Sequence, residues 1–198
     1  MDKNKQSLKA TFAEALQNYQ KRDFKTAEFF CYKILSIDAN HFDSLSLLAN
    51  IFAINKNFDK AKEFLNKAIA IQPKNTNILN NLGTAHKELG KPEDAINFYQ
   101  KVLKIDTDHT NANYNLGLLF YKLGELKKAK NYFEKTVKIQ PNYALAHFSL
   151  GNLQKGFKEL KKAKTSYLKA IEIRPSFTSA QNNLGLVFSE MGDSKAAI

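Results

Sequence analysis

Apolar and polar residues follow each other along this chain with helical spacing, and the pattern returns every 34 residues. Each window holds two amphipathic stretches separated by a short turn, which predicts a pair of α-helices. The reference window reads Asn80-Asn81-Leu82-Gly83, then Gly90, Ala95, Tyr99 and Ile105. A fixed period of this length is typical of stacked helix pairs, so the predicted fold class is all-α, an α-solenoid of antiparallel helix pairs.

The period divides residues 1–198 into a single array. The predicted repeats are 8–41, 42–75, 76–109, 110–143, 144–177 and a partial repeat at 178–198. The helices predicted in the first three repeats are 7–20 and 24–37, 42–55 and 58–71, and 76–89 and 92–105. Gly90 precedes Lys91-Pro92, so we expect a turn followed by a proline in the first turn of a helix, where its missing N–H has no cost.

Small residues occupy one position of each first helix and one of each second helix. The first column is Ala15, Ala49, Gly83, Gly117, Gly151 and Gly185, and the second is Ala27, Ala61, Ala95, Ala129, Ala163 and Ala197. Glycine inside a helix costs about 1 kcal/mol relative to alanine, so close packing of the paired helices is expected to offset that cost. A third column, expected to fill the remaining gaps between helices, is Ile37, Ile71, Ile105, Ile139 and Ile173.

The chain is basic, and its charge is unevenly distributed. The formal net charge is +11 at pH 7, of which residues 110–177 hold +9. Such an asymmetry can steer an acidic partner, but a solvated outer face is the commoner reason for a run of charges.

The one cysteine, Cys31, shares a repeat position with Leu65 and Tyr99 and is expected to be a buried small hydrophobe.

Several classes of function are disfavoured by the sequence. It has no run of about 18 apolar residues that could cross a membrane, and residues 1–6 lead into an amphipathic segment rather than an apolar signal core. We therefore expect a cytoplasmic protein with no membrane partner.

The sequence has no glycine-rich phosphate loop, no Gly-x-Ser-x-Gly nucleophile elbow and no clustered metal ligands, so we also expect no enzymatic activity and no cofactor. The histidines, interpreted as turn or packing residues, are His41, His86, His109 and His147.

These columns resemble the tetratricopeptide repeat family over about residues 8–198. The residues that carry the resemblance are Leu82-Gly83, Ala95 and Tyr99 in one repeat, Leu116-Gly117, Phe120, Ala129, Phe133 and Pro141 in the next, and Leu150-Gly151, Ala163, Tyr167, Ala170 and Pro175 after it. The resemblance implies a right-handed superhelix whose first helices line a concave groove. The chain departs from the family pattern at Glu14, in place of leucine, and at Ala39 and Thr107, in place of proline.

The groove face of the first helices carries the candidate binding residues. Side-chain amides both donate to and accept from a peptide backbone, and interleaved aromatic rings add apolar contact. The candidates are Asn77, Asn80, Asn81, Asn111, Tyr114, Asn115, Tyr121, Phe148, Asn152, Asn182 and Asn183. Three lysines expected at the edge of the groove, where they would favour an acidic ligand, are Lys87, Lys122 and Lys155.

The asparagine column has two interpretations. Asn81, Asn115 and Asn183, interrupted by Ser149, partly resemble the groove asparagine ladder in the tetratricopeptide region of O-linked N-acetylglucosamine transferase, where the ladder holds the backbone of a substrate peptide. Compositional drift in a chain rich in asparagine and lysine explains the same residues equally well.

The sequence leaves several functional hypotheses. The leading one is a protein-interaction scaffold that binds an extended, acidic peptide segment in the groove. The alternative is the substrate-recognition arm of a larger glycosyltransferase or sulfotransferase that continues beyond Ile198, because the last repeat stops early in its second helix. The lysine-rich second helices also suggest nucleic-acid binding, which is disfavoured because aromatic stacking partners are not beside the lysines. The incomplete last repeat is a candidate surface for self-association.

Overall fold

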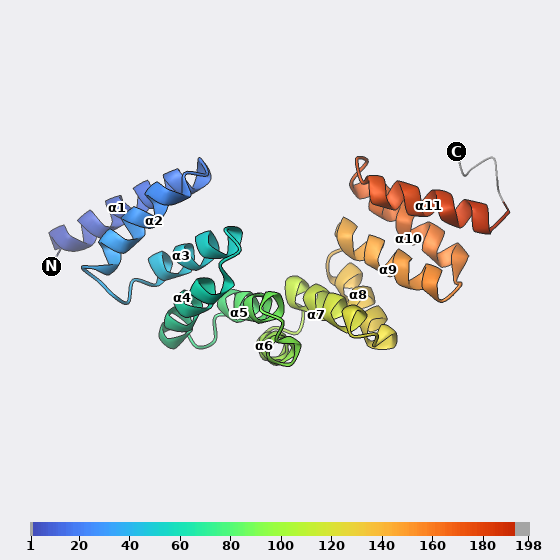
Figure 1. Ribbon diagram of the computed structural model, residues 1–198, viewed down its shortest axis with the longest axis horizontal. Helices are drawn as coiled ribbons and strands as arrows, with labels where there is room; N and C mark the ends of the chain where they lie inside the picture. Colours follow the sequence, from blue (N-terminus) through green and yellow to red (C-terminus); the bar gives the residue numbers. More distant parts are fainter. Residues whose placement is uncertain (1, 193–198) are drawn as a thin grey trace. The chain divides into compact units, whose positions relative to one another are not determined.

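The computed structural model describes residues 2–192, with side chains from Gln6 onward, and this part of the chain contains eleven α-helices (Figure 1). The helix bounds are α1 Asp2–Gln20, α2 Phe24–Leu35, α3 Phe42–Ile54, α4 Phe58–Ile71, α5 Thr76–Glu88, α6 Pro92–Ile105, α7 Thr110–Lys122, α8 Leu126–Ile139, α9 Ala144–Gly156, α10 Leu160–Ile173 and α11 Thr178–Glu190. The predicted all-α fold class is confirmed. The two helices predicted for the first repeat need correction. The helix predicted at 7–20 begins at Asp2, and the helix predicted at 24–37 ends at Leu35.

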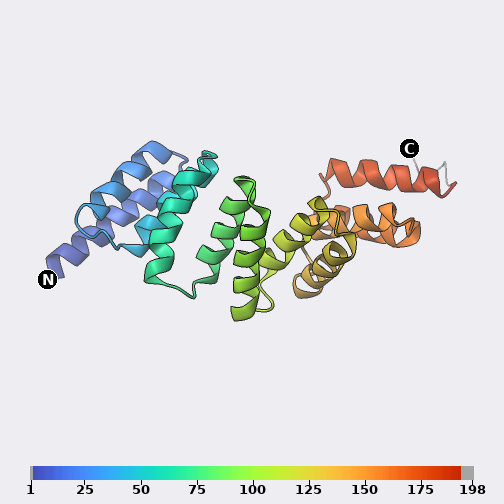
Figure 2. The same cartoon turned by 60° about the horizontal axis from the view of Figure 1, so that its bottom comes forward.

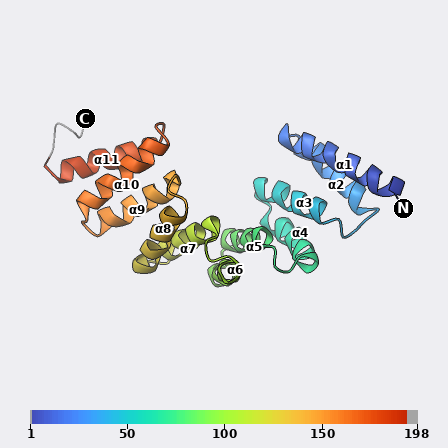
Figure 3. The ribbon, with the colours of Figure 1, turned by 180° about the vertical axis from the view of Figure 1, so that it is seen from behind.

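The helices pack as consecutive pairs, α1 on α2 through α9 on α10, and each pair also contacts the first helix of the next pair in its own unit. Figures 2 and 3 show these hairpins from two further sides. The chain divides into two compact units, Met1–Ile105 with α1 to α6 (unit 1) and Asp106–Ile198 with α7 to α11 (unit 2). A helix pair cannot bury its apolar face alone, so each unit derives its stability from neighbouring pairs.

The turn inside each pair requires one residue in the left-handed backbone conformation. The residue lies at the same position of every repeat, with φ between 58° and 79°. The six residues are Arg22, Lys56, Gly90, Gly124, Lys158 and Gly192. Glycine adopts this conformation without the steric cost of a Cβ, which accounts for the turn predicted at Gly90. The helix that follows begins at Pro92, as expected.

The glycines of the first helices make room for aromatic rings of the second helices. A Cβ atom built on Gly83, Gly117 or Gly151 would lie 2.5 to 2.7 Å from a ring carbon of Tyr99, Phe133 or Tyr167, respectively. These rings and the alanines of the second column from Ala27 to Ala163 are buried. The close packing expected at Gly83, Gly117, Gly151 and these alanines is therefore confirmed, and each of the three glycines faces an aromatic side chain. Ala197 lies outside the described residues.

The isoleucines of this column in unit 1 lie outside the core, contrary to the sequence prediction, whereas Ile139 and Ile173 in unit 2 are half-buried. Ile37, Ile71 and Ile105 are between 38% and 60% exposed. Ile71 and Ile105 are the last residues of α4 and α6, and Ile37 lies beyond the end of α2. An apolar side chain at the end of a helix extends past the surface covered by the partner helix, so these isoleucines are only partly packed.

The histidines have structural partners, in agreement with their interpretation. The Nδ1 atoms of His41 and His109 accept hydrogen bonds from the backbone N–H groups of Ser44 and Ala112, both at 3.2 Å. These bonds cap the N-termini of α3 and α7 and place the proton of each neutral ring on Nε2. His86 Nδ1 lies 3.2 Å from Asp94 Oδ2. A carbonyl oxygen can only accept, so His147 donates from Nε2 to the Pro141 carbonyl at 2.8 Å.

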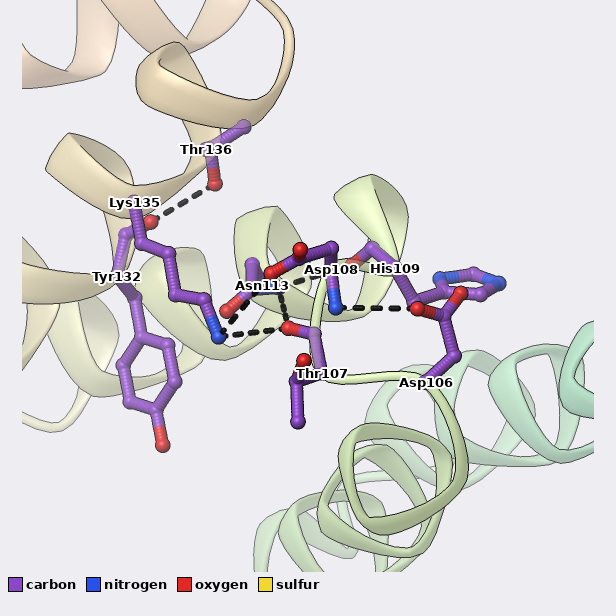
Figure 4. Close-up of polar contacts among 8 residues, drawn as sticks. All are labelled: Asp106, Thr107, Asp108, His109, Asn113, Tyr132, Lys135 and Thr136. Carbon is purple, nitrogen blue, oxygen red and sulfur yellow. Dashed lines mark hydrogen bonds and ion pairs between the residues drawn. The ribbon is translucent and has the colours of Figure 1, made fainter.

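Thr107 stands in the turn before α7, where the tetratricopeptide pattern that the chain resembles has proline, and polar side chains hold that turn (Figure 4). The Thr107 carbonyl accepts from Asn113 Nδ2 at 3.2 Å and from Lys135 Nζ at 2.6 Å. Asn113 is fully buried and also donates to the His109 carbonyl at 3.1 Å. A turn that lacks the rigidity of proline is thereby fixed by side chains from α7 and α8.

Cys31 is buried against the core of unit 1, and burial raises the pKa of its thiol to about 12. Because the thiolate is the reactive species, we expect Cys31 to react with a disulfide reagent at pH 8 at least about 100-fold more slowly in the folded protein than in denaturant. Ellman's reagent would measure both rates. Immediate labelling of the folded chain would contradict the burial of this side chain.

Candidate functional site

In unit 2, the first helices α7 and α9 border a hollow of about 290 Å³. Four of the candidate residues line this hollow, namely Tyr114, Tyr121, Phe148 and Asn152. Leu118, Leu145, Ser149, Phe133 and Phe177 complete the lining. The 34-residue register thus brings together side chains that are separated by one repeat in the sequence, and the resulting surface is mostly aromatic with a few polar groups.

Aromatic contacts hold the wall of this hollow. The Phe148 ring centroid lies 4.8 Å from that of Phe177, and the Tyr114 ring centroid lies 5.0 Å from that of Tyr143. Burial raises the pKa of Tyr114, and a hydrogen bond with Ser149 partly opposes this effect. The Tyr114 hydroxyl therefore stays protonated at neutral pH. Tyr121, in contrast, is 46% exposed at the rim.

Asn152 is the polar centre of the same hollow. Its Oδ1 atom accepts from the Tyr167 hydroxyl and from Asn183 Nδ2, both at 2.8 Å. Burial raises the pKa of Tyr167 to about 12, so its hydroxyl remains a donor at neutral pH. The two bonds fix the plane of the Asn152 amide, and its Nδ2 group consequently points in a defined direction.

Unit 1 contains a second hollow of about 330 Å³ against the first helices α3 and α5. Asn81 lines it and donates from Nδ2 to Asn50 Oδ1 over 3.4 Å. This hollow is also lined by Asn50, Tyr19, Ile54 and Phe58, which are not among the predicted binding residues. Asn50 could have been found, because it occupies the repeat position of Asn152.

The remaining candidates lie outside the two hollows. Asn77, Asn111 and Asn182 are exposed, Asn115 is half-buried, and Asn80 is buried. Lys87 is half-buried with its Nζ 3.0 Å from Glu88 Oε1, Lys155 is half-buried, and Lys122 is exposed. The three asparagines of the ladder column, Asn81, Asn115 and Asn183, are all half-buried. The two amide pairs Asn81 to Asn50 and Asn183 to Asn152 link neighbouring first helices within a unit.

None of the helices within residues 2–192 is both long and apolar enough to cross a membrane. Within the same residues, no three His, Cys, Asp or Glu side chains come together as a metal site.

Comparisons with known proteins agree with this geometry. A sequence profile described as tetratricopeptide repeat matches residues 40–108 and 77–142, and another with the same description matches 144–177. A search of curated proteins found no match.

Solved structures with a similar fold include MamA, which is 28% identical with a TM-score of 0.67 over 76% of this chain and 88% of its own. PilF of Pseudomonas aeruginosa is 22% identical with a TM-score of 0.87, covering 98% and 88% of the two chains. YrrB, described as "a TPR protein with an unusual peptide-binding site", is 22% identical with a TM-score of 0.67, covering 90% and 92%. Below 25% identity, the likeness to PilF and YrrB concerns the fold alone.

Proposed function

Because this chain belongs to the tetratricopeptide repeat family, an interaction-scaffold family, we propose that it is a non-enzymatic scaffold that binds an extended segment of a partner protein against its first helices. The hollow between α7 and α9 carries this proposal. Its volume of about 290 Å³ is at the small end of ligand sites, which suits one large side chain of a bound segment.

The chemistry of the hollow suits an apolar anchor on a peptide backbone. Tyr114, Tyr121 and Phe148 provide large contact areas with few rotatable bonds, so ordering them on binding costs little entropy. The Asn152 amide, already fixed by Tyr167 and Asn183, can donate from Nδ2 to a peptide carbonyl without first losing freedom. Lys122 and Lys155, on the same two helices, favour a segment with acidic residues beside the anchor.

The fold likeness to YrrB supports peptide binding as a property of this kind of array, although the likeness covers architecture only. The hollow of unit 1 offers a second, similar contact through Asn50 and Asn81. A segment that uses either hollow would rely on the same combination of apolar contact and amide hydrogen bonds.

We expect Tyr121→Ala to weaken peptide binding about tenfold, the size typical of an aromatic interface residue. Peptides selected from a random display library would be titrated calorimetrically into the wild-type chain and the variant. Tyr121 is 46% exposed, so the substitution should leave the fold intact.

The matched control is Leu168→Ala, since Leu168 is 45% exposed but lies on the second helix α10. Its affinity should equal that of the wild-type protein. Equal affinities for all three proteins, or a library that yields no peptide binding better than about 1 mM, would refute the proposed site.

A further inference from the structure

The three turns that follow the first helices of unit 2 each expose a large apolar side chain. Leu123, Phe157 and Met191 are 44%, 37% and 39% exposed. They occupy the same repeat position, directly after the last residues of α7, α9 and α11. We call the surface formed by residues 122–128, 155–162 and 190–192 the turn edge.

The turn edge is continuous. Lys130, on the helix α8 that follows the first turn, has its Nζ 3.2 Å from Glu159 Oε1 and 5.8 Å from the Phe157 ring centroid. These contacts join the start of α8 to the second turn. Lys158 Nζ lies 3.4 Å from Glu190 Oε2, which joins the second turn to the end of α11. Figure 1 shows the C-terminal ends of α7, α9 and α11 on the same side of unit 2.

Lysines flank the three exposed apolar residues Leu123, Phe157 and Met191 in the segments of the turn edge. The turn edge contains Lys122, Lys127, Lys128, Lys155, Lys158, Lys161 and Lys162, against Glu125, Glu159 and Glu190. Glu159 is shared between Lys130 and Lys162. Lys127 and Lys161 are exposed, and neither forms an ion pair with another described residue. The edge therefore keeps a positive charge that its own carboxylates do not neutralise.

Unit 1 provides an internal comparison, because the same turns recur there with different chemistry. The positions of Leu123, Phe157 and Met191 hold Lys21, Asn55 and the half-buried Leu89. Residues 20–26, 54–60 and 88–94 contain six basic and five acidic side chains. Ile54, one position earlier in its repeat, is 50% exposed. Building a helix pair thus requires neither an exposed apolar side chain at the position of Leu123 nor a lysine excess.

Lys127 and Lys161 also do not stabilise the helices that bear them. Lys127 and Lys161 lie in the first turns of α8 and α10, and neither of these two turns contains an acidic residue. In contrast, α6 begins with Glu93 and Asp94. A positive charge opposes the helix dipole at this end. The combination of lysine and exposed apolar residue is therefore better explained by a partner than by folding.

We propose that the turn edge of unit 2 docks on an anionic lipid surface. The side chains of Leu123, Phe157 and Met191 enter the boundary between head groups and acyl chains, and the surrounding lysines contact lipid phosphates. Peripheral attachment needs no spanning helix. A nucleic acid would instead favour stacking platforms, which the aliphatic Leu123 and Met191 do not provide. This surface shares only Lys122 and Lys155 with the site proposed for peptide binding, and Leu123, Phe157 and Met191 do not line the hollow.

The test is flotation of the full chain with lipid vesicles. Binding is expected to vesicles with about 30 mol% phosphatidylserine but not to pure phosphatidylcholine, and it should weaken as salt screens the lysines. Lys127→Glu/Lys161→Glu should reduce the partition coefficient at least about 25-fold, which is about fivefold for each lysine lost. Leu123→Ser/Phe157→Ser should reduce it about tenfold through the lost apolar insertion.

Two control variants separate the turn edge from general effects of charge and apolarity. Lys21→Glu/Lys25→Glu makes the same charge change on a turn of unit 1, and Leu168→Ser removes an equally exposed apolar group from α10. Both should bind vesicles like the wild-type chain. Absence of binding to anionic vesicles, or binding that the serine variant leaves unchanged, would overturn the proposal. Retention of single-stranded RNA in a gel shift, lost only in the glutamate variant, would assign the lysines to nucleic acid instead.

Discussion

Gly117→Ala should destabilise unit 2 by about 1–3 kcal/mol, the usual cost of overpacking a core. A Cβ at this position would lie 2.5 Å from Phe133 Cε1 and 2.6 Å from Cδ1. The Phe133 ring is 1% exposed, so it cannot move aside without displacing α8 from α7. The direction of this change is informative, because replacing glycine by alanine elsewhere in a helix stabilises the protein by about 1 kcal/mol. Urea denaturation followed by helical circular dichroism measures the change.

Gly156→Ala is the matched control. Gly156 is the last residue of α9, and an added Cβ meets no atom within 4 Å. We expect this variant to be as stable as the wild-type chain or slightly more stable. If the two alanine variants changed the free energy of unfolding alike, the close approach to Phe133 would not be what requires glycine at position 117.

The chain itself suggests a compensating change for Gly117→Ala. In the second repeat, the positions of Gly117 and Phe133 hold Ala49 and Leu65, and both are buried in the core of unit 1. The double variant Gly117→Ala/Phe133→Leu reproduces that pair. Its cost should be lower than the sum of the single costs by at least about 1 kcal/mol, since the two side chains share one space. Simple additivity would contradict this pairing.

This pairing was present in the sequence but is visible only when two columns are compared. Ala15 and Ala49 are matched with Cys31 and Leu65, whereas Gly83, Gly117 and Gly151 are matched with tyrosine or phenylalanine. The period alone identifies which positions are small. It does not identify the facing residue, because that depends on how the second helix is rotated against the first.

Periodicity predicted the helices well and failed where a column lies at a helix end. The isoleucines near the ends of α2, α4 and α6 recur as regularly as the core alanines, yet they are substantially exposed. A repeat pattern indicates the position of a residue within its repeat, but it does not indicate how much of the side chain a neighbouring helix buries. For the same reason, the sequence could not distinguish buried Asn80 from half-buried Asn81, which lies one residue further around α5.

The candidate site was only partly predictable. Helical spacing correctly grouped Tyr114, Tyr121, Phe148 and Asn152 around one hollow. The hydrogen bonds that orient Asn152 come from Tyr167 on α10 and Asn183 on α11, and such pairings depend on side-chain rotamers that a sequence pattern does not specify.

Tyr167→Ala is expected to cost about 3–5 kcal/mol, as large-to-small changes of a buried aromatic ring do. The ring is fully buried, packs on Gly151, and lies 6.0 Å from the Phe148 ring centroid. Its loss would leave a cavity between α9 and α10. The midpoint of urea denaturation would fall accordingly, and the hollow proposed for peptide binding would lose one of its supports.

Tyr167→Phe separates the ring from its hydroxyl. The phenylalanine variant keeps the packing but leaves Asn152 Oδ1 with only the bond from Asn183 Nδ2, so we expect a loss of about 1 kcal/mol. Should both Tyr167 variants be equally unstable, the hydrogen bond rather than the buried ring would hold α9 to α10. If the phenylalanine variant is stable yet binds selected peptides more weakly, the hydroxyl acts by fixing the Asn152 amide, because a freely rotating amide loses more entropy when it pairs with a peptide carbonyl.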